Sequence, residues 1–146
     1  WRDWAEPADV ETEPGGFERL GVLDAMERMR EPGLSLGGGV SLFVEPTRAL
    51  VAVDVNVADA GSGAGLRANI AAARALPREL RLRGLGGQIV MDCAPMPKKD
   101  RKTFESALRA ALRGDGIETS MVGWTPMGHF ELQRKRARQP LSELWP

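Results

Sequence analysis

The apolar residues in the middle of the chain follow the two-residue period of β-strands. Residues 40–45 ("VSLFVE") and 49–56 ("ALVAVDVN") are rich in β-branched side chains, and the "PTR" between them is typical of a tight turn. These two segments are predicted to form an antiparallel hairpin. Residues 88–93, 117–124 and 129–135 are predicted as further short strands, the last two paired around a "TPMG" turn.

Three other segments have the spacing of amphipathic helices. Residues 17–30 carry apolar side chains three apart and end before a Pro-Gly pair. Residues 66–76 are alanine-rich, and Pro77 is predicted to kink or restart this helix before it ends at "GLGG". Residues 98–113 place apolar residues on one face and end at Gly114.

The alternation of strands and helices, with hairpins between some strands, predicts an α/β fold. We expect a mixed β-sheet flanked by helices. The 146 residues fit one domain with a real core. Residues 1–36 are interpreted as an acidic linker and a helix at the tail of an upstream subdomain, and residues 37–146 as the domain that carries the sheet. The "LSLGGGV" stretch at 34–40 is predicted to be a glycine-rich bend.

Composition and charge restrict the function classes. The longest apolar runs are far shorter than the roughly 20 residues that span a bilayer, and no signal peptide is visible. The single cysteine, Cys93, cannot form an internal disulfide, so we expect a cytoplasmic protein. Residues 1–48 carry ten acids and five bases, a balance of −5, and residues 49–146 carry ten acids and fifteen bases, a balance of +5. The basic part suits a polyanionic partner, and it equally suits an ordinary solvated surface.

Polar side chains at two strand ends supply the candidate chemistry. Asp54 and Asn56 share one face of their strand, because side chains alternate. If the strand that ends at Asp92 lies alongside, the two aspartates come within about 5 Å. Carboxylates that close repel each other, and Mg²⁺ between them would remove the repulsion. The alternative is that each aspartate only caps a helix or forms a turn.

Three longer stretches carry a family resemblance. The segments "LGGGVSLFVEPTRALVAVDVN", "LRLRGLGGQIVMDC" and "GHFELQRKRARQPLSELW" resemble, in order and spacing, the catalytic core of the bacterial ribonuclease E/G family. The resemblance implies a deoxyribonuclease I-like subdomain in which Asp54 and Asp92 bind Mg²⁺ (or Mn²⁺) and Asn56 positions water and phosphate. The implied reaction is endonucleolytic cleavage of single-stranded RNA to 5′-phosphate and 3′-hydroxyl ends, in RNA processing or decay.

The chain also departs from the family pattern. The loop after Asn56 is short and glycine-rich, Gly84 stands where the family tends to have aspartate, and Cys93 stands where it has phenylalanine. Upstream S1 and 5′-sensing regions and the Cys-Pro-x-Cys zinc motif of many members are not found in this chain, so we expect no zinc within it. Contacts of a homo-oligomer are expected in regions not present here, and the chain alone is expected to cleave RNA poorly.

Five basic residues are predicted to contact RNA phosphates because they coincide with family motifs: Arg81, Arg83, Arg134, Lys135 and Arg136. Each has an alternative. The first two could complement a helix C-terminus, and the other three could lie on a solvated strand. The basic residues of 97–104 could steer RNA, but an ordinary polar helix start is favoured.

The remaining polar candidates are interpreted as structural. His129 is predicted to be a turn or solvent-facing histidine, Cys93 a small buried hydrophobe, and Trp124 a packing residue. Asn69 has two equally good interpretations, a residue that contacts the substrate and an ordinary polar residue on a helix surface. Two other functions stay open, a non-catalytic RNA-binding or scaffolding relative and a phosphatase or DNA nuclease.

Overall fold

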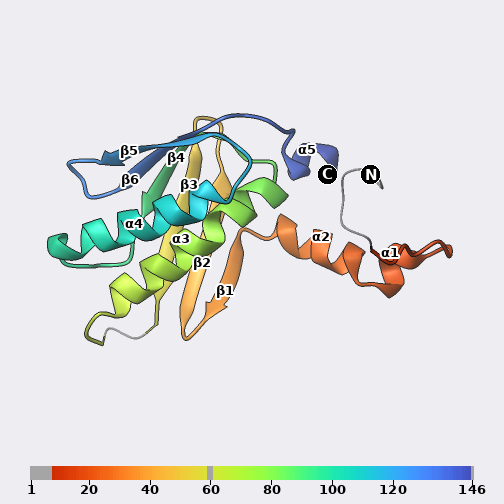
Figure 1. Cartoon of the computed structure of the whole chain (residues 1–146), viewed down its shortest axis with the longest axis horizontal. Helices are drawn as coiled ribbons and strands as arrows, with labels where there is room; N and C mark the ends of the chain where they lie inside the picture. The colour runs from red at the N-terminus through yellow and green to blue at the C-terminus, as the bar shows by residue number, and fades with distance from the viewer. Residues whose placement is uncertain (1–7, 59–60, 146) are drawn as a thin grey trace.

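The computed structural model, which describes residues 8–58 and 61–145, is built on one six-stranded sheet (Figure 1). The strand order is β1-β2-β3-β4-β6-β5, and only β3 and β4 run parallel. The mixed α/β architecture predicted from the sequence is confirmed. The strands are β1 (Gly33–Gly37), β2 (Val40–Pro46), β3 (Val51–Val57), β4 (Gly87–Asp92), β5 (Thr119–Trp124) and β6 (Phe130–Arg134).

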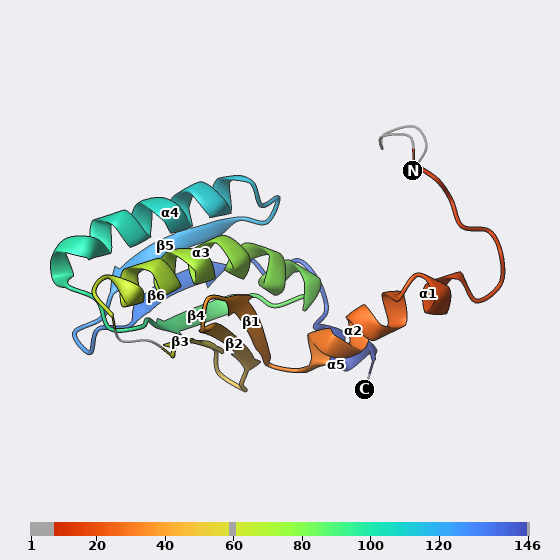
Figure 2. The ribbon, with the colours of Figure 1, turned by 90° about the horizontal axis from the view of Figure 1, so that it is seen from below.

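Two long helices cover one face of this sheet. They are α3 (Ala64–Leu82) and α4 (Arg101–Arg113), and the 3₁₀ turn η1 (Lys98–Asp100) leads into α4. Figure 2 shows both on the same side of the strands, and no helix of the described chain covers the other side. The shorter helices α1 (Gly16–Arg19) and α2 (Val22–Arg30) lead away from the sheet, and α5 (Leu141–Leu144) lies near α2. None of the described helices has the length and apolar character needed to cross a membrane.

The core lies between the sheet and the two helices because alternate strand residues point toward them. Val53 and Val55 of β3 are 2% and 3% exposed, and Met91 of β4 is fully buried. Ala68 and Ala72 of α3 are also fully buried, and their small side chains let the helix approach the strands closely. The intervening residues of β3 and β4 therefore face the uncovered side, which we call the open face.

The predicted strands and the predicted hairpin are confirmed. Strands β2 and β3 pair antiparallel, and β5 and β6 pair around the turn at 125–128. Strand β4 and helix α4 lie where the sequence pattern placed them. These elements have strong local periodicity, which is why sequence alone predicts them.

Two helix predictions need correction. Helix α3 continues through Pro77 without interruption, and Pro77 is buried in its packed face. Burial of this apolar face outweighs the one backbone hydrogen bond that proline removes. The predicted helix at 17–30 is divided into α1 and α2 at Gly21, whose φ of 67° is left-handed. Helix α5 was not predicted.

The glycine-rich segment at 34–40 is only partly a bend. Gly37, Gly38 and Gly39 all have positive φ and form the turn, but Gly33–Gly37 is the edge strand β1. A Cβ on Gly33 would lie 2.7 Å from a ring carbon of Phe43 on β2, so the missing side chain makes room for that ring. Packing against Phe43 therefore favours a strand here. The sheet begins at Gly33, before residue 37, where the domain that carries the sheet was predicted to start.

Candidate active site

The two aspartates at the ends of β3 and β4 lie side by side. The parallel register pairs Asp54 with Asp92 directly. Neighbouring strands are about 4.8 Å apart, so the backbone brings the two carboxylates to one place. Both side chains belong to the open face, because Val53, Val55 and Met91 point to the core. The predicted register is confirmed.

The acid pair receives a polar neighbour but no cation from the chain. The side-chain amide of Asn56 donates a hydrogen bond of 2.7 Å to Asp54 Oδ2. Asp54 is half-buried, and the Asp92 side chain is 67% exposed. Within the described residues, neither carboxylate forms an ion pair with a lysine or arginine. Two adjacent like charges therefore lie together with no lysine or arginine of the described residues to offset them.

The donor set fits a hard cation that keeps part of its water shell. In residues 8–58 and 61–145, no group of three or more histidine, cysteine, aspartate or glutamate side chains gathers at one point. Mg²⁺ is usually held by one or two carboxylates together with water and phosphate oxygens, which matches Asp54 and Asp92.

His129 is a neighbour of the acid pair that sequence reasoning missed. Its Nε2 lies 3.9 Å from Asp92 Oδ1, and its side chain is 37% exposed. The predicted turn position is confirmed, since the His129 N–H donates to Thr125 Oγ1 at 3.1 Å and its carbonyl accepts from the Thr125 N–H at 2.8 Å. Strand β6 pairs with β4, and only that non-local pairing brings the histidine to Asp92.

Asn69 of α3 holds the segment that leaves Asp92. Its amide donates to the Ala94 carbonyl, and the Ala94 N–H donates back to Asn69 Oδ1, both at 2.8 Å. Asn69 is fully buried, so neither the substrate contact nor the helix-surface position describes it. A Cβ on Gly65 would lie 1.8 Å from the Pro95 carbonyl oxygen, so the helix touches this segment directly. Helix α3 thus fixes the path of the chain just after the acid pair.

Comparison with known proteins agrees with this geometry. A family model described as "Ribonuclease E/G family" matches residues 7–137. The chain belongs to the ribonuclease E/G family. Ribonuclease G of Salmonella typhimurium (strain SL1344) is 34% identical over 137 residues, which cover 88% of this chain and 27% of that protein. Ribonuclease E of Escherichia coli (strain K12) is 36% identical over 133 residues, covering 87% of this chain and 12% of that protein. The chain spans about a quarter of the length of the ribonuclease G relatives that it matches.

Two departures of this ribonuclease E/G family member have local explanations. Gly84 has a φ of +68°, and a Cβ there would lie 2.2 Å from the Gln139 carbonyl oxygen, so an aspartate would not fit without moving that segment. Cys93 is partly buried beside the core. Burial, and then the charge of Asp92, raises the pKa of its thiol to about 12, against the opposing effect of Arg101. The thiol is protonated at neutral pH and is a poor nucleophile.

Arg134, from the family motif that predicted an RNA contact, is instead part of a buried ionic cluster. Its Nη1 contacts Asp115 Oδ2 and lies 2.8 Å from Thr119 Oγ1, and its side chain is fully buried. Arg81 contributes a second contact, 2.7 Å from its Nη1 to Asp115 Oδ1. Burial by itself would raise the pKa of Asp115, but hydrogen bonds from Arg134 and Arg81 outweigh it, and the pKa is lowered. The predicted phosphate contact of Arg134 is corrected, because its guanidinium is enclosed by protein.

Arg83 is also corrected to a structural role. Its side chain is 6% exposed, and its Nε lies 3.4 Å from Glu79 Oε2. Its Nη1 donates to the Glu31 carbonyl at 2.8 Å, which attaches the α2–β1 connection to α3. Arg81 is 38% exposed, so it keeps some access to solvent beside its contact with Asp115.

Lys135 and Arg136 are exposed, and their predicted RNA contacts stay predictions. They follow Arg134, which pairs with Gly87 at the start of β4. Asp92 ends β4, and a strand of this length extends about 17 Å. The sheet therefore separates these basic residues from the acid pair instead of bringing them together.

Proposed function

We propose that this chain is the catalytic part of a Mg²⁺-dependent endoribonuclease that cleaves single-stranded RNA to 5′-phosphate and 3′-hydroxyl ends. The observation that carries the proposal is the direct register of Asp54 and Asp92 on an open face, where no lysine or arginine of the described residues pairs with either carboxylate. Membership of the ribonuclease E/G family supports the ribonuclease class. The metal, the RNA substrate and the product ends belong to the proposal.

The proposed roles follow from where each side chain lies. Asp54 and Asp92 would hold Mg²⁺, which when bound activates water and offsets phosphate charge. Asn56 orients the Asp54 carboxylate through its amide hydrogen, and its carbonyl oxygen stays available as an acceptor. The open face gives an extended RNA strand access to the pair, because no described helix lies over it. Asn69 keeps the chain after Asp92 in place from the opposite side.

A cleavage assay tests the enzyme. A 5′-labelled single-stranded RNA is incubated with the chain over a Mg²⁺ titration, and the product ends are typed by their response to phosphatase and ligase. Asp54→Asn and Asp92→Asn are each expected to lower the rate by more than the roughly 10–100-fold that loss of a supporting partner costs a metal site. Asp24→Asn, an exposed substitution on α2, is the control. Cleavage at the control rate by both site variants would overturn the proposal.

A second measurement tests metal binding without relying on activity. Mg²⁺ that binds only the folded chain should raise the free energy of unfolding by about 2.7 kcal/mol at one hundred times its Kd. The shift is expected in the wild type and in Asp24→Asn. It should be absent from Asp54→Asn and Asp92→Asn. Equal shifts in all four proteins would place any bound metal elsewhere.

A non-catalytic RNA-binding role is the second candidate. It is favoured by the sparse donor set, because no group of three or more histidine, cysteine, aspartate or glutamate side chains gathers within the described residues. In that case RNA binding would weaken with salt, and no divalent metal would support cleavage. A panel of RNA, DNA and small phosphate esters in the same assay separates both candidates from a phosphatase or DNA nuclease.

A further inference from the structure

The exposed charged side chains on the outer surface of the helical layer are all basic. Among the described residues from 61 to 114, the only exposed acid is Asp92, which lies on the open face. The acids of the two helices themselves are withdrawn, since Glu79 is buried and Glu105 accepts a hydrogen bond from the Trp124 indole at 2.7 Å. The exposed cations form what we call the helix-layer surface: Arg67, Arg74, Arg78, Lys98, Lys99, Lys102, Arg109 and Arg113.

Most of these cations have no ionic partner in the described chain. Arg78 pairs with Glu79 at 2.9 Å, and Arg67 donates to the Ser62 carbonyl at 3.0 Å. No ion pair within the described residues involves any of the other six. The protein therefore leaves a concentrated positive charge on one side.

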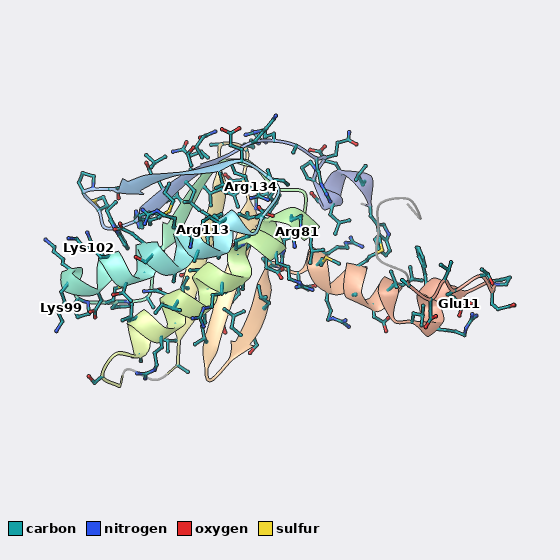
Figure 3. All side chains as sticks on the ribbon, viewed as in Figure 1. Glu11, Arg81, Lys99, Lys102, Arg113 and Arg134 are labelled. Carbon is teal, nitrogen blue, oxygen red and sulfur yellow. The ribbon has the colours of Figure 1, made fainter. Side chains whose placement is uncertain are left out.

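Four of the cations form a row along α4 and the turn before it. Lys99, Lys102, Arg109 and Arg113 recur at intervals of three, seven and four residues, which places them on one side of the helix. The buried Phe104 and Leu108 lie on the opposite side. At 1.5 Å per residue the row is about 21 Å long. Figure 3 shows Lys99 and Lys102 at the outer end of α4 and Arg113 toward its other end.

Helix stability does not explain this arrangement. The N-terminus of a helix carries a partial positive charge, so cations there are unfavourable by a few tenths to about 1 kcal/mol each. Lys98, Lys99 and Lys102 all lie at that end of α4, against one acidic residue, the half-buried Asp100 at its N-cap. A role outside the fold accounts better for three cations at an unfavourable helix end.

The surface fits a nucleic-acid backbone better than a membrane. Helices that lie on membranes insert large apolar side chains beside their cations. The exposed large apolar residues of the described chain lie elsewhere, none of them on α3 or α4. Each helix follows its strand, so the N-termini of α3 and α4 lie at the same sheet edge as the acid pair. An RNA strand leaving the acid pair would cross this edge at Lys98 and Lys99 and reach the row.

We infer that the helix-layer surface binds the backbone of an RNA segment beyond the cleavage point, on the side of the sheet opposite Asp54 and Asp92. The inference rests on the proposed function for the identity of the polyanion. Binding of this kind is sequence-independent, weakens with salt and favours RNAs long enough to reach both faces. The acid pair alone would not produce this preference for longer RNAs.

Two triple variants of the full chain test the inference. Glutamine removes each charge and keeps helix propensity. The surface variant removes charge from the α4 row, and the matched control removes the same number of charges from the other end of the molecule. The surface variant is Lys102→Gln, Arg109→Gln and Arg113→Gln, and the control is Arg28→Gln, Arg30→Gln and Arg48→Gln.

Binding of fluorescein-labelled single-stranded RNAs of two lengths, roughly 5 and 25 nucleotides, is measured by anisotropy in EDTA over a salt series. The surface variant is expected to bind the long RNA about tenfold more weakly, with a salt slope smaller by about 2, since each phosphate contact on a single strand contributes about 0.7. Binding of the short RNA should change less than twofold. The control triple should leave both RNAs within twofold of the wild type.

Other outcomes overturn the inference. Wild-type binding of the long RNA by the surface variant would do so, and so would an equal loss of RNA binding in the control triple. Binding to vesicles containing phosphatidylserine is measured in parallel, and a surface variant that loses vesicle binding but keeps RNA binding would also overturn the inference. Thermal unfolding checks that the variants fold. If the surface triple does not fold, the single variants Lys102→Gln and Arg109→Gln replace it, and each is expected to lose part of the affinity for the long RNA. Because EDTA removes cleavage from the readout, a failure of this surface is distinct from a failure of the acid pair.

Discussion

Two charged clusters lie near opposite ends of β4, and they differ in how their charge is balanced. Near the start of β4, Arg81 and Arg134 enclose Asp115, whose side chain is 1% exposed. At the end of β4, Asp92 and Asp54 lie side by side with no cation from the described chain. The first cluster places one carboxylate between two guanidinium groups, although Arg134 Nε and Nη2 have no hydrogen-bond partner among the described residues. The second cluster places two carboxylates side by side.

The difference has opposite consequences for stability at the two clusters. A buried ion pair whose members hydrogen-bond each other contributes to one native arrangement, and removing one member leaves an uncompensated charge. Adjacent exposed carboxylates have the reverse property, because removing one relieves repulsion. Stability measurements should therefore respond strongly at the first cluster and weakly at the second, while activity should respond in the opposite order.

The largest effect is expected from Asp115→Asn. The substitution leaves the enclosed Arg134 guanidinium without its counter-charge, which typically costs about 3–5 kcal/mol for a buried pair. Urea unfolding followed by circular dichroism measures the loss. Asp24→Asn on exposed α2 is the control and should change stability by less than about 0.5 kcal/mol. A loss below about 1 kcal/mol for Asp115→Asn would contradict the structural role of the cluster.

The same cluster should make stability depend on acid pH. The pKa of Asp115 is lower in the folded protein than in the unfolded chain. Its stabilisation is therefore fully present above the unfolded value of about 3.9 and is lost as pH falls through the folded value. Thermal unfolding between pH 6 and pH 2 should show a steeper decline for the wild type than for Asp115→Asn. Parallel curves would show that this carboxylate is not the group responsible.

An intermediate effect is expected from Asn69→Ala, on the helix that holds the chain behind Asp92. The substitution leaves the Ala94 N–H and carbonyl without their side-chain partner, at a cost of about 1–3 kcal/mol. Cleavage per folded molecule should also fall, since Asp92 lies two residues before Ala94 in the chain. Asn69→Asp keeps the acceptor for the Ala94 N–H but turns a carboxylate oxygen toward the Ala94 carbonyl in a fully buried site, so it should lose at least as much stability. Full stability and full activity in Asn69→Ala would remove this positioning role.

The smallest effect on stability is expected at the acid pair itself. Without divalent metal, Asp92→Asn should change the free energy of unfolding by less than about 0.5 kcal/mol, because the side chain is 67% exposed and no lysine or arginine of the described residues pairs with it. The sign should be toward greater stability, since a like charge is removed beside Asp54. Denaturant titration in EDTA measures it. A loss of several kcal/mol would mean that Asp92 is a structural residue.

The sequence by itself determined the elements with strong local periodicity and the placement of the acidic residues on them. The alternation of Val51, Val53 and Val55 with Asp54 and Asn56 specified which side chains share a face. That alternation, together with a strand ending at Asp92, predicted the acid pair on the condition that the two strands are neighbours, and the parallel pairing of β3 with β4 fulfils it. Family motifs added the expected chemistry.

Only the tertiary structure decided what lies against each of the other polar groups. Arg134 and Arg83 are motif residues that were predicted to contact RNA, yet both are buried. Arg134 lies against Asp115, nineteen residues earlier in the chain, and Arg83 donates to the distant Glu31 carbonyl. His129 reaches Asp92 through a pairing of strands distant in the chain. Local spacing specifies the direction of a side chain relative to its own backbone, whereas burial and ionic partners depend on which distant segments pack there.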